Sequence, residues 1–131
     1  MASDRIDWVL LQVDTWNSGD FEGFLAAVGP EFEFSPDPSF PDAGTYRGEE
    51  LRRWMRDWVK TWRENRLEVL AISEERGAVI ADARWHLVAP QTGGEIPIED
   101  FTMVFWFDPE GKPGRMAAFF DRQRALDAVD A

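Results

Sequence analysis

Carboxyl groups are the reactive side chains that this sequence offers most often, and two of them stand near the ends of extended segments. Asp121 is the last residue of a strand-like segment, directly before a short helical one, and Asp100 lies near the start of another strand-like segment. Burial in an apolar pocket disfavours the charged form of a carboxyl group, which can then exchange a proton near neutral pH. Asp121 is therefore the first candidate for acid/base chemistry, and Asp100 is a second. The alternatives are a helix N-cap for Asp121 and a solvated strand edge for Asp100.

The single histidine and the single tyrosine are the other candidates. Histidine titrates nearer to neutral pH than other side chains, so His86 is a candidate base. Strand alternation, however, groups His86 with Asp82 and Arg84, which indicates the outer face of a sheet or a dimer contact. Tyr46 either donates a hydrogen bond to a developing oxyanion or only packs at the start of the helix that follows it.

Composition excludes several other kinds of chemistry. The chain has no cysteine, which excludes disulfides, thiolate nucleophiles and cysteine-ligated metals. One histidine, with no spaced set of histidines and carboxylates, argues against a metal site. The serines fall at predicted caps, loops and turns rather than in a triad, and no glycine-rich loop joins a strand to a helix as a nucleotide site needs. We therefore expect no metal and no cofactor.

Charge and hydropathy restrict the partners. The net charge of −11 repels phosphate backbones and anionic lipid surfaces, so we expect neither nucleic acid nor membrane as a partner. No apolar run approaches the ~20 residues of a membrane-spanning helix, and the N-terminus lacks the layout of a signal peptide. The sequence predicts a cytoplasmic protein with one domain over residues 1–131.

Aromatic side chains are in surplus, with seven tryptophans and ten phenylalanines. The helix predicted over residues 48–63 carries Trp54, Trp58 and Trp62 on one apolar stripe, which must lie against a broad surface such as a sheet. Rings of this kind either fill the core or form the wall of a pocket. The candidates for a ligand-binding wall are Trp16, Phe32, Phe40, Trp54, Trp58, Trp85, Met103 and Phe105.

The remaining periodicity predicts an α+β fold. Two helices and a strand over residues 31–35 precede the long helix. A meander of four strands follows, which are expected near residues 67–72, 78–88, 96–107 and 115–121, and then a short closing helix over 122–129. The helices are expected on one face of an antiparallel sheet, with Ile6, Val9, Leu10, Val13 and Trp16 as the inward stripe of the first helix. A strongly bent sheet around the long helix would leave a conical hollow at its open end.

The segment over residues 36–45 has three prolines and one glycine. Proline limits the conformational freedom of a loop, so we predict an ordered loop or a lid rather than a flexible linker. Phe40 lies in the middle of this loop and is exposed unless the loop folds over another surface.

Several stretches resemble the SnoaL-like branch of the nuclear transport factor 2-like superfamily. They are Trp16-Asn17-Ser18-Gly19-Asp20-Phe21, Tyr46-Arg47-Gly48, Phe105-Trp106-Phe107-Asp108 with Gly111-Lys112, and Phe119-Phe120-Asp121-Arg122 with Ala125-Leu126. The resemblance covers nearly the whole chain. It implies a cone-shaped α+β barrel with a curved antiparallel or mixed sheet, a pocket between the long helix and the sheet, and often a homodimer. The superfamily includes ketosteroid isomerase, limonene epoxide hydrolase and scytalone dehydratase.

The resemblance also suggests a role for Asp121. In polyketide cyclases of the SnoaL type, an aspartate on the last strand is the acid/base, and Asp121 takes that place here. A histidine-tryptophan pair is usual on that strand, whereas this chain has Met116-Ala117-Ala118-Phe119. We expect a pocket that binds a small apolar or polycyclic molecule and performs cofactor-free isomerisation, cyclisation or dehydration. The alternative is a non-catalytic module that binds a ligand or a protein. A homodimer through the outer face of the sheet is expected in either case.

Overall fold

The computed structural model describes residues 4–40 and 43–130, and its elements follow the predicted order closely. They are α1 (Asp4–Asn17), α2 (Phe21–Val28), β1 (Glu33–Ser35), β2 (Tyr46–Arg47), α3 (Gly48–Thr61), β3 (Glu64–Glu75), β4 (Ala78–Val88), β5 (Glu95–Phe107), β6 (Pro113–Phe119) and α4 (Arg122–Asp130). The α+β class and the four-strand meander are confirmed. The two-residue strand β2 was not predicted, because so short a segment carries no alternation.

The strands form one mixed sheet in the order β2-β1-β6-β5-β4-β3. The meander β3–β6 is antiparallel, whereas β1 pairs with β6 in parallel and with β2 in antiparallel orientation. The register shifts between Val69 and Ala71 and again between Ala83 and Trp85, and bulges of this kind bend strands. The predicted curved sheet is confirmed, but it is not closed into a barrel, because the edge strands β2 and β3 lie at opposite ends of the order.

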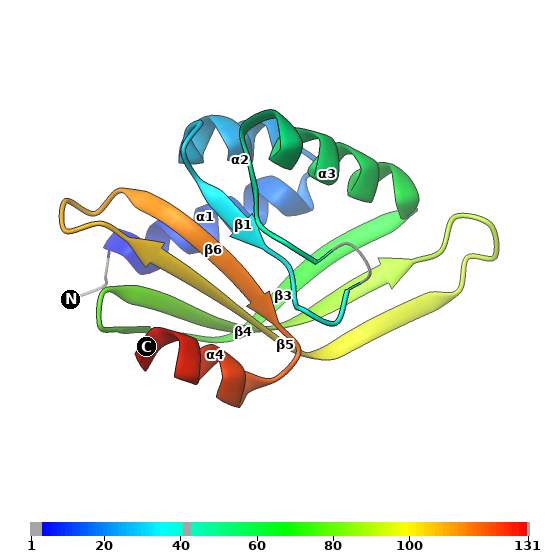
Figure 1. Cartoon of the computed structure of the whole chain (residues 1–131). Helices are drawn as coiled ribbons and strands as arrows, with labels where there is room; N and C mark the ends of the chain where they lie inside the picture. The colour runs from blue at the N-terminus through cyan, green and yellow to red at the C-terminus, as the bar shows by residue number, and fades with distance from the viewer. Residues whose placement is uncertain (1–3, 41–42, 131) are drawn as a thin grey trace.

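Helices α1, α2 and α3 cover one face of the sheet, and α4 lies on the opposite face (Figure 1). The prediction that all helices share one face is therefore wrong for α4. The reason lies in β4 and β5, whose outward positions are apolar near one end. Ala78, Ile80 and Val104 are fully or almost fully buried there, and α4 covers them with Ala125 and Val129.

The main core lies between the first three helices and the inner face of the sheet. Strand β4 contributes Val79, Ala81, Ala83, Trp85 and Leu87, as its alternation predicts.

The first helix differs from the prediction. Leu10 is 38% exposed, whereas Gln12 is only 5% exposed. Leu10 lies about 100° around the helix from Val9, away from the line that faces the sheet. Gln12 lies beside Val9 and Val13 on the covered side, and all three are buried.

Candidate ligand-binding cavity

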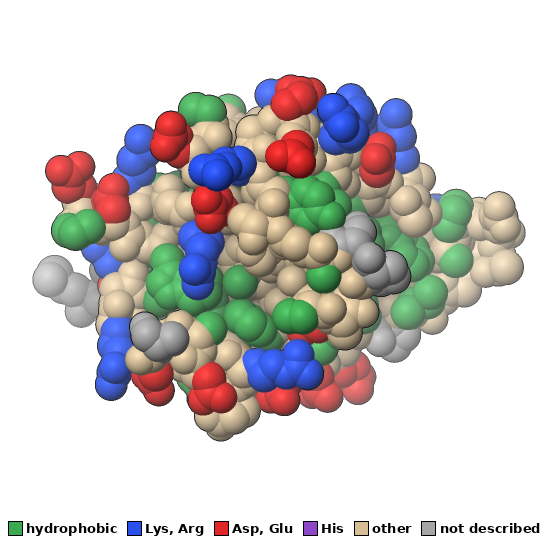
Figure 2. Space-filling view, viewed as in Figure 1, with side chains coloured by type: hydrophobic (Ala, Val, Ile, Leu, Met, Phe, Trp, Pro, Cys, Tyr) green, Lys and Arg blue, Asp and Glu red, His purple; other side chains and the backbone are tan. Residues whose placement is uncertain are grey.

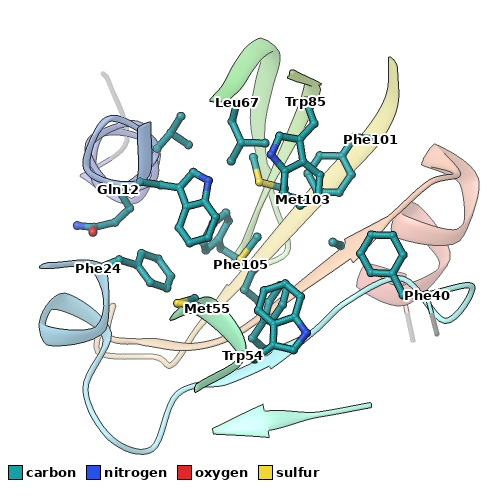
Figure 3. A pocket seen from close by; sticks show the side chains of 15 residues that line it. Gln12, Phe24, Phe40, Trp54, Met55, Leu67, Trp85, Phe101, Met103 and Phe105 are labelled. Carbon is teal, nitrogen blue, oxygen red and sulfur yellow. The ribbon is translucent and has the colours of Figure 1, made fainter. Parts of the chain in front are cut away.

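An apolar cavity of about 60 Å³ lies between the helices and the inner face of the sheet. Helices α1, α2 and α3, which cover the inner face of the sheet, and most strands contribute to its wall, as Figure 3 shows for the labelled side chains. Gln12 and Phe24 lie at one end of this view, and Phe40 lies at the other. The full wall consists of Gln12, Val13, Trp16, Phe24, Phe34, Phe40, Trp54, Met55, Leu67, Trp85, Phe101, Met103, Phe105, Met116 and Ala118.

The accessible surface of the cavity is apolar, and its described lining residues include no carboxylate, histidine, lysine or tyrosine. The polar atoms that these residues carry are the Gln12 amide, which points away from the cavity in Figure 3, and the indole N–H groups of the tryptophans. Trp85 donates its N–H to Oδ1 of Asn65. By contrast, Gln12 Oε1 and Trp16 Nε1 are buried and have no hydrogen-bond partner in the part of the chain that the structure describes. A buried unsatisfied group of this kind costs about 1–3 kcal/mol, so both atoms favour a bound partner.

Six of the eight predicted wall residues line the cavity: Trp16, Phe40, Trp54, Trp85, Met103 and Phe105. Phe32 does not, because its ring packs edge-on against Phe24 in the core, with centroids 5.9 Å apart. Trp58 also lies outside the lining. Sequence reasoning did not single out Gln12, Phe24, Met55, Phe101 or Met116 as wall residues. Phe101 alternates with Met103 and Phe105, which could have indicated it, but nothing in the sequence distinguishes Gln12 from a surface glutamine.

Five aromatic rings form a closed cycle beside the cavity, and we call this cycle the aromatic collar. Trp58 stacks on Trp85 with ring centroids 4.9 Å apart, and Trp85 contacts Phe101 at 5.0 Å. Phe101 contacts Phe120 at 6.0 Å, and Phe120 contacts Phe40 at 5.0 Å. Phe40 then stacks on Trp58 at 5.8 Å and completes the cycle. Three of its members, Trp85, Phe101 and Phe40, also line the cavity, away from Gln12 (Figure 3).

Asp121 lies outside the cavity, and the structure gives it the alternative role considered above. Its Oδ1 accepts a hydrogen bond of 2.8 Å from the backbone N–H of Gln123 in the first turn of α4. Its Oδ2 lies 4.0 Å from Nε of Arg124, and the side chain is 52% exposed. The desolvation that would prepare this carboxyl group for proton transfer is therefore missing in this conformation.

The other three acid/base candidates also lie outside the cavity lining. Asp100 is exposed on β5 and borders a cleft on the outer surface together with Asp121. His86 lies on the outer face of β4, with Nε2 3.1 Å from Glu68 and Nδ1 3.6 Å from Glu95. Tyr46 is on β2, and its ring lies 6.1 Å from that of Trp54. Of the four candidates, only Asp100 and Asp121 come together.

Glu68 shows how the outer-face charges affect one another. The hydrogen bond from His86 holds the pKa of the Glu68 carboxyl below its ordinary value of 4.5, and the nearby Arg84 acts in the same direction. Arg84 Nη1 lies 3.6 Å from Glu68 and its Nε lies 3.8 Å from Glu99. These pairs span β3, β4 and β5 and are partly open to solvent.

Asp37 is a buried carboxylate that sequence reasoning missed. It is 1% exposed, and it accepts hydrogen bonds from the backbone N–H of Ser39 at 2.8 Å and of Phe120 at 2.7 Å. Burial acts to raise the pKa of the Asp37 carboxyl, but the hydrogen bonds from the Ser39 side chain and from the two backbone N–H groups, together with the charge of Arg124, outweigh it, so the pKa lies below its ordinary value of 3.8. The turn-forming sequence Asp-Pro-Ser was a usable signal, since aspartate side chains often bond to the backbone two residues on.

The loop over residues 36–45 is attached at both ends, although residues 41 and 42 lie outside the described part. Asp37 joins it to the end of β6 through Phe120. At the other end, the hydroxyl groups of Ser35 and Thr45 are 3.0 Å apart and share a hydrogen bond. These attachments hold Phe40 against the neighbouring rings of the collar, Trp58 and Phe120.

Residues 4–40 and 43–130 contain neither a metal-binding cluster nor a membrane-spanning helix. No group of three or more histidines and acidic residues is arranged there to hold a metal ion. None of the helices there has the length and apolar character needed to cross a membrane.

Comparison with known proteins identifies the family. Residues 9–122 match the profile of the SnoaL-like domain. The chain belongs to the SnoaL-like family. No curated protein matches the sequence.

Solved structures with this fold include proteins of several descriptions. One is an NTF2-like protein of unknown function from Burkholderia pseudomallei, with a TM-score of 0.78, 19% identity, and coverage of 99% of this chain and 100% of the other. Another is TerC, co-crystallised with polyporic acid, with a TM-score of 0.76, 19% identity, and coverage of 98% and 100%. A third is the epoxide hydrolase/cyclase-like enzyme SalBIII, with a TM-score of 0.73, 18% identity, and 88% coverage of both chains. At these identities the likeness shows the fold.

Proposed function

We propose that this SnoaL-like protein binds a small, mostly apolar molecule in the cavity between α1, α3 and the sheet. The observation that carries the proposal is an apolar cavity whose wall includes two residues with a buried polar atom that lacks a hydrogen-bond partner in the described part of the chain: Gln12 Oε1, an acceptor, and Trp16 Nε1, a donor. A ligand with a hydroxyl or carbonyl group on an apolar body would bond to these atoms and remove the cost of leaving them unpaired. TerC, which shares the fold, was co-crystallised with a small molecule, and this supports the proposal.

The chemistry of the wall favours binding without proton transfer. Among the lining residues that the structure describes there is no carboxylate, histidine, lysine or tyrosine, so the described wall offers the ligand no acid or base. This agrees with the alternative of a non-catalytic ligand-binding module.

Native mass spectrometry of the protein purified from its own host would test the proposal, because a ligand held in an enclosed cavity is retained. The variant Trp16→Phe keeps an apolar ring and removes the N–H donor. We expect it to bind the recovered ligand about fivefold more weakly, which corresponds to one hydrogen bond of about 1 kcal/mol. Trp106→Phe, on the outer face, is the matched control and should bind as the wild type does. Equal affinity in all three proteins would contradict the proposed role of Trp16.

A second candidate function is cofactor-free isomerisation, cyclisation or dehydration. One observation favours it: Phe101 borders both the cavity and the outer cleft that contains Asp100 and Asp121. A ligand that extends past Phe101 would therefore reach two carboxyl groups. If so, Asp121→Asn should abolish product formation from the recovered ligand and leave binding unchanged. Unchanged turnover would remove Asp121 from the mechanism.

We also propose a homodimer, as the family resemblance implies, with the outer face of the sheet as the contact surface. Leu70 is 52% exposed and borders the same cleft as Asp82 and Glu99, and an apolar side chain rimmed by polar ones is common at interfaces. Sedimentation at micromolar concentration should then give twice the mass of one chain.

A further inference from the structure

The cavity is too small for a ring-bearing ligand in the conformation described. Its volume is about 60 Å³, whereas an apolar protein cavity of about 150 Å³ is known to accept benzene. The polycyclic ligand expected from the sequence does not fit this space. If the proposed function is correct, part of the wall must move when the ligand binds.

Phe40 is the wall residue best placed to move. Most of the other lining residues lie on α1, α2, α3 or the sheet, where backbone hydrogen bonds hold them. Phe40 lies on the loop between β1 and β2, and its backbone bonds are local, from its own N–H to the Asp37 carbonyl and from the Ala43 N–H to its carbonyl. Loop segments with few long-range contacts open at a lower free energy than core elements.

The surroundings of the Phe40 ring define what could replace it. The ring stacks on Trp58 at an interplanar angle of 27° and meets Phe120 edge-to-face at 70°. Trp58 continues this stack to Trp54, with an interplanar angle of 7° and centroids 5.5 Å apart. A slot with a flat face on one side and a ring edge on the other suits another planar aromatic ring, whose quadrupole favours both contacts.

The surface around the loop agrees with this view. Figure 2 shows apolar side chains gathered across the middle of the face, between charged side chains near α2 and α3 and those near α4. Asp37 is buried and already occupied by backbone N–H groups, so it would hold the loop rather than contact the ligand.

We propose that Phe40 is a built-in plug that occupies part of the ligand site, and that the ligand carries a planar aromatic ring which takes the place of the Phe40 ring between Trp58 and Phe120. This inference rests on the proposed function and specifies its ligand class. Displacement of Phe40 adds the volume of a phenyl ring to the cavity at the end away from Gln12 (Figure 3), and the ligand ring then contacts Trp58 and Phe120.

Two probes with the same carbon skeleton test the aromatic requirement: 2-naphthol, which is planar, and trans-decahydro-2-naphthol, which is not. Affinities are measured by titration calorimetry for the wild type and Phe40→Ala. Phe40→Ala, which removes the plug, should raise the affinity for 2-naphthol at least tenfold. Its affinity for the saturated alcohol should rise much less. Phe107→Ala is the matched control, because Phe107 is a partly buried ring outside the lining that packs on Trp8. It should leave both affinities unchanged.

The outcomes separate the plug from the proposed function. If Phe40→Ala binds 2-naphthol as the wild type does, or more weakly, Phe40 is a fixed part of the wall and the plug is refuted, while ligand retention by the wild type would still support a binding role. If Phe40→Ala raises the affinity for the saturated alcohol as much as the affinity for 2-naphthol, the proposal that the ligand is aromatic is refuted.

If Phe40→Ala does not fold, a second variant keeps the test possible. Phe40→Leu keeps an apolar side chain but loses the planar ring, and a rise in the affinity for 2-naphthol is expected of it too. Absence of tightening in that folded variant would overturn the plug.

Discussion

The two faces of β4 carry opposite kinds of side chain over residues 82–87, beyond the apolar outer positions that α4 covers. The inner face, from Val79 to Leu87, is apolar and almost completely buried. The outer face has Asp82, Arg84 and His86, each within ion-pair distance of a charged neighbour.

The difference separates binding from proton chemistry. Inside, burial is nearly complete, and polar atoms such as Trp16 Nε1 have no hydrogen-bond partner in residues 4–40 and 43–130, so a ligand gains much by bonding to them. Outside, the charges are paired and partly solvated, which makes them weak contributors to stability. The two regions approach each other at Phe101, which borders the cavity on one side and the acidic cleft on the other.

The largest expected effect tests burial on the inner face. Trp85 is 5% exposed, stacks on Trp58 and contacts the tilted ring of Phe101, so Trp85→Ala should cost about 3–5 kcal/mol of unfolding free energy. Trp106 is on the outer face and only partly buried, with the Arg115 guanidinium 3.8 Å above its ring. Trp106→Ala should cost clearly less. Urea unfolding of both variants checks this, and equal losses would remove the distinction between the faces.

An intermediate effect is expected where a charge is buried. Asp37→Asn places an amide where two backbone N–H groups donate, so at pH 7 it should cost about 1–3 kcal/mol. Asp108→Asn is the matched control, because Asp108 also accepts from two backbone N–H groups but in an exposed turn, where water can replace the lost bonds.

The same variant has a defined pH dependence. The folded pKa of Asp37 is below its ordinary value of 3.8, so its carboxylate contributes stability that is complete above that value and is lost as the pH falls through the folded pKa. The advantage of the wild type over Asp37→Asn should therefore shrink at pH 3, as measured by urea unfolding. An advantage that is the same at pH 3 and pH 7 would show that the charge is not involved.

The smallest effect is expected on the outer face. His86→Ala removes the hydrogen bond that lowers the pKa of the Glu68 carboxyl, so that pKa should rise toward 4.5, its ordinary value, with little change in thermal stability. Carboxyl carbon NMR titration measures the shift. Glu95→Gln, which alters the other side of the His86 ring, is the comparison and should leave the Glu68 pKa nearly unchanged.

Sequence patterns predicted the fold better than the site. Alternation along β4 and the tryptophan stripe of α3 identified the inner face correctly, because burial imposes a period on many residues at once. Gln12 and Asp37 were missed, since each is a polar residue whose burial depends on contacts far along the chain. Asp121 was predicted as the last residue of a strand over 115–121, whereas β6 ends at Phe119. Whether its carboxyl group faces a cavity or caps a helix depends on one side-chain direction that no periodicity fixes.

The bond between Asp37 and Phe120 joins residues that are 83 positions apart. A contact over such a separation forms only after the chain between its ends has been ordered. During synthesis, residue 37 leaves the ribosome well before residue 120 exists, and domains begin to fold from their N-terminal part. The slot beside Trp58 is thus completed only after the last strand has been made, since Phe120 and the Asp37 carboxylate must both be in place before the loop that carries Phe40 is held.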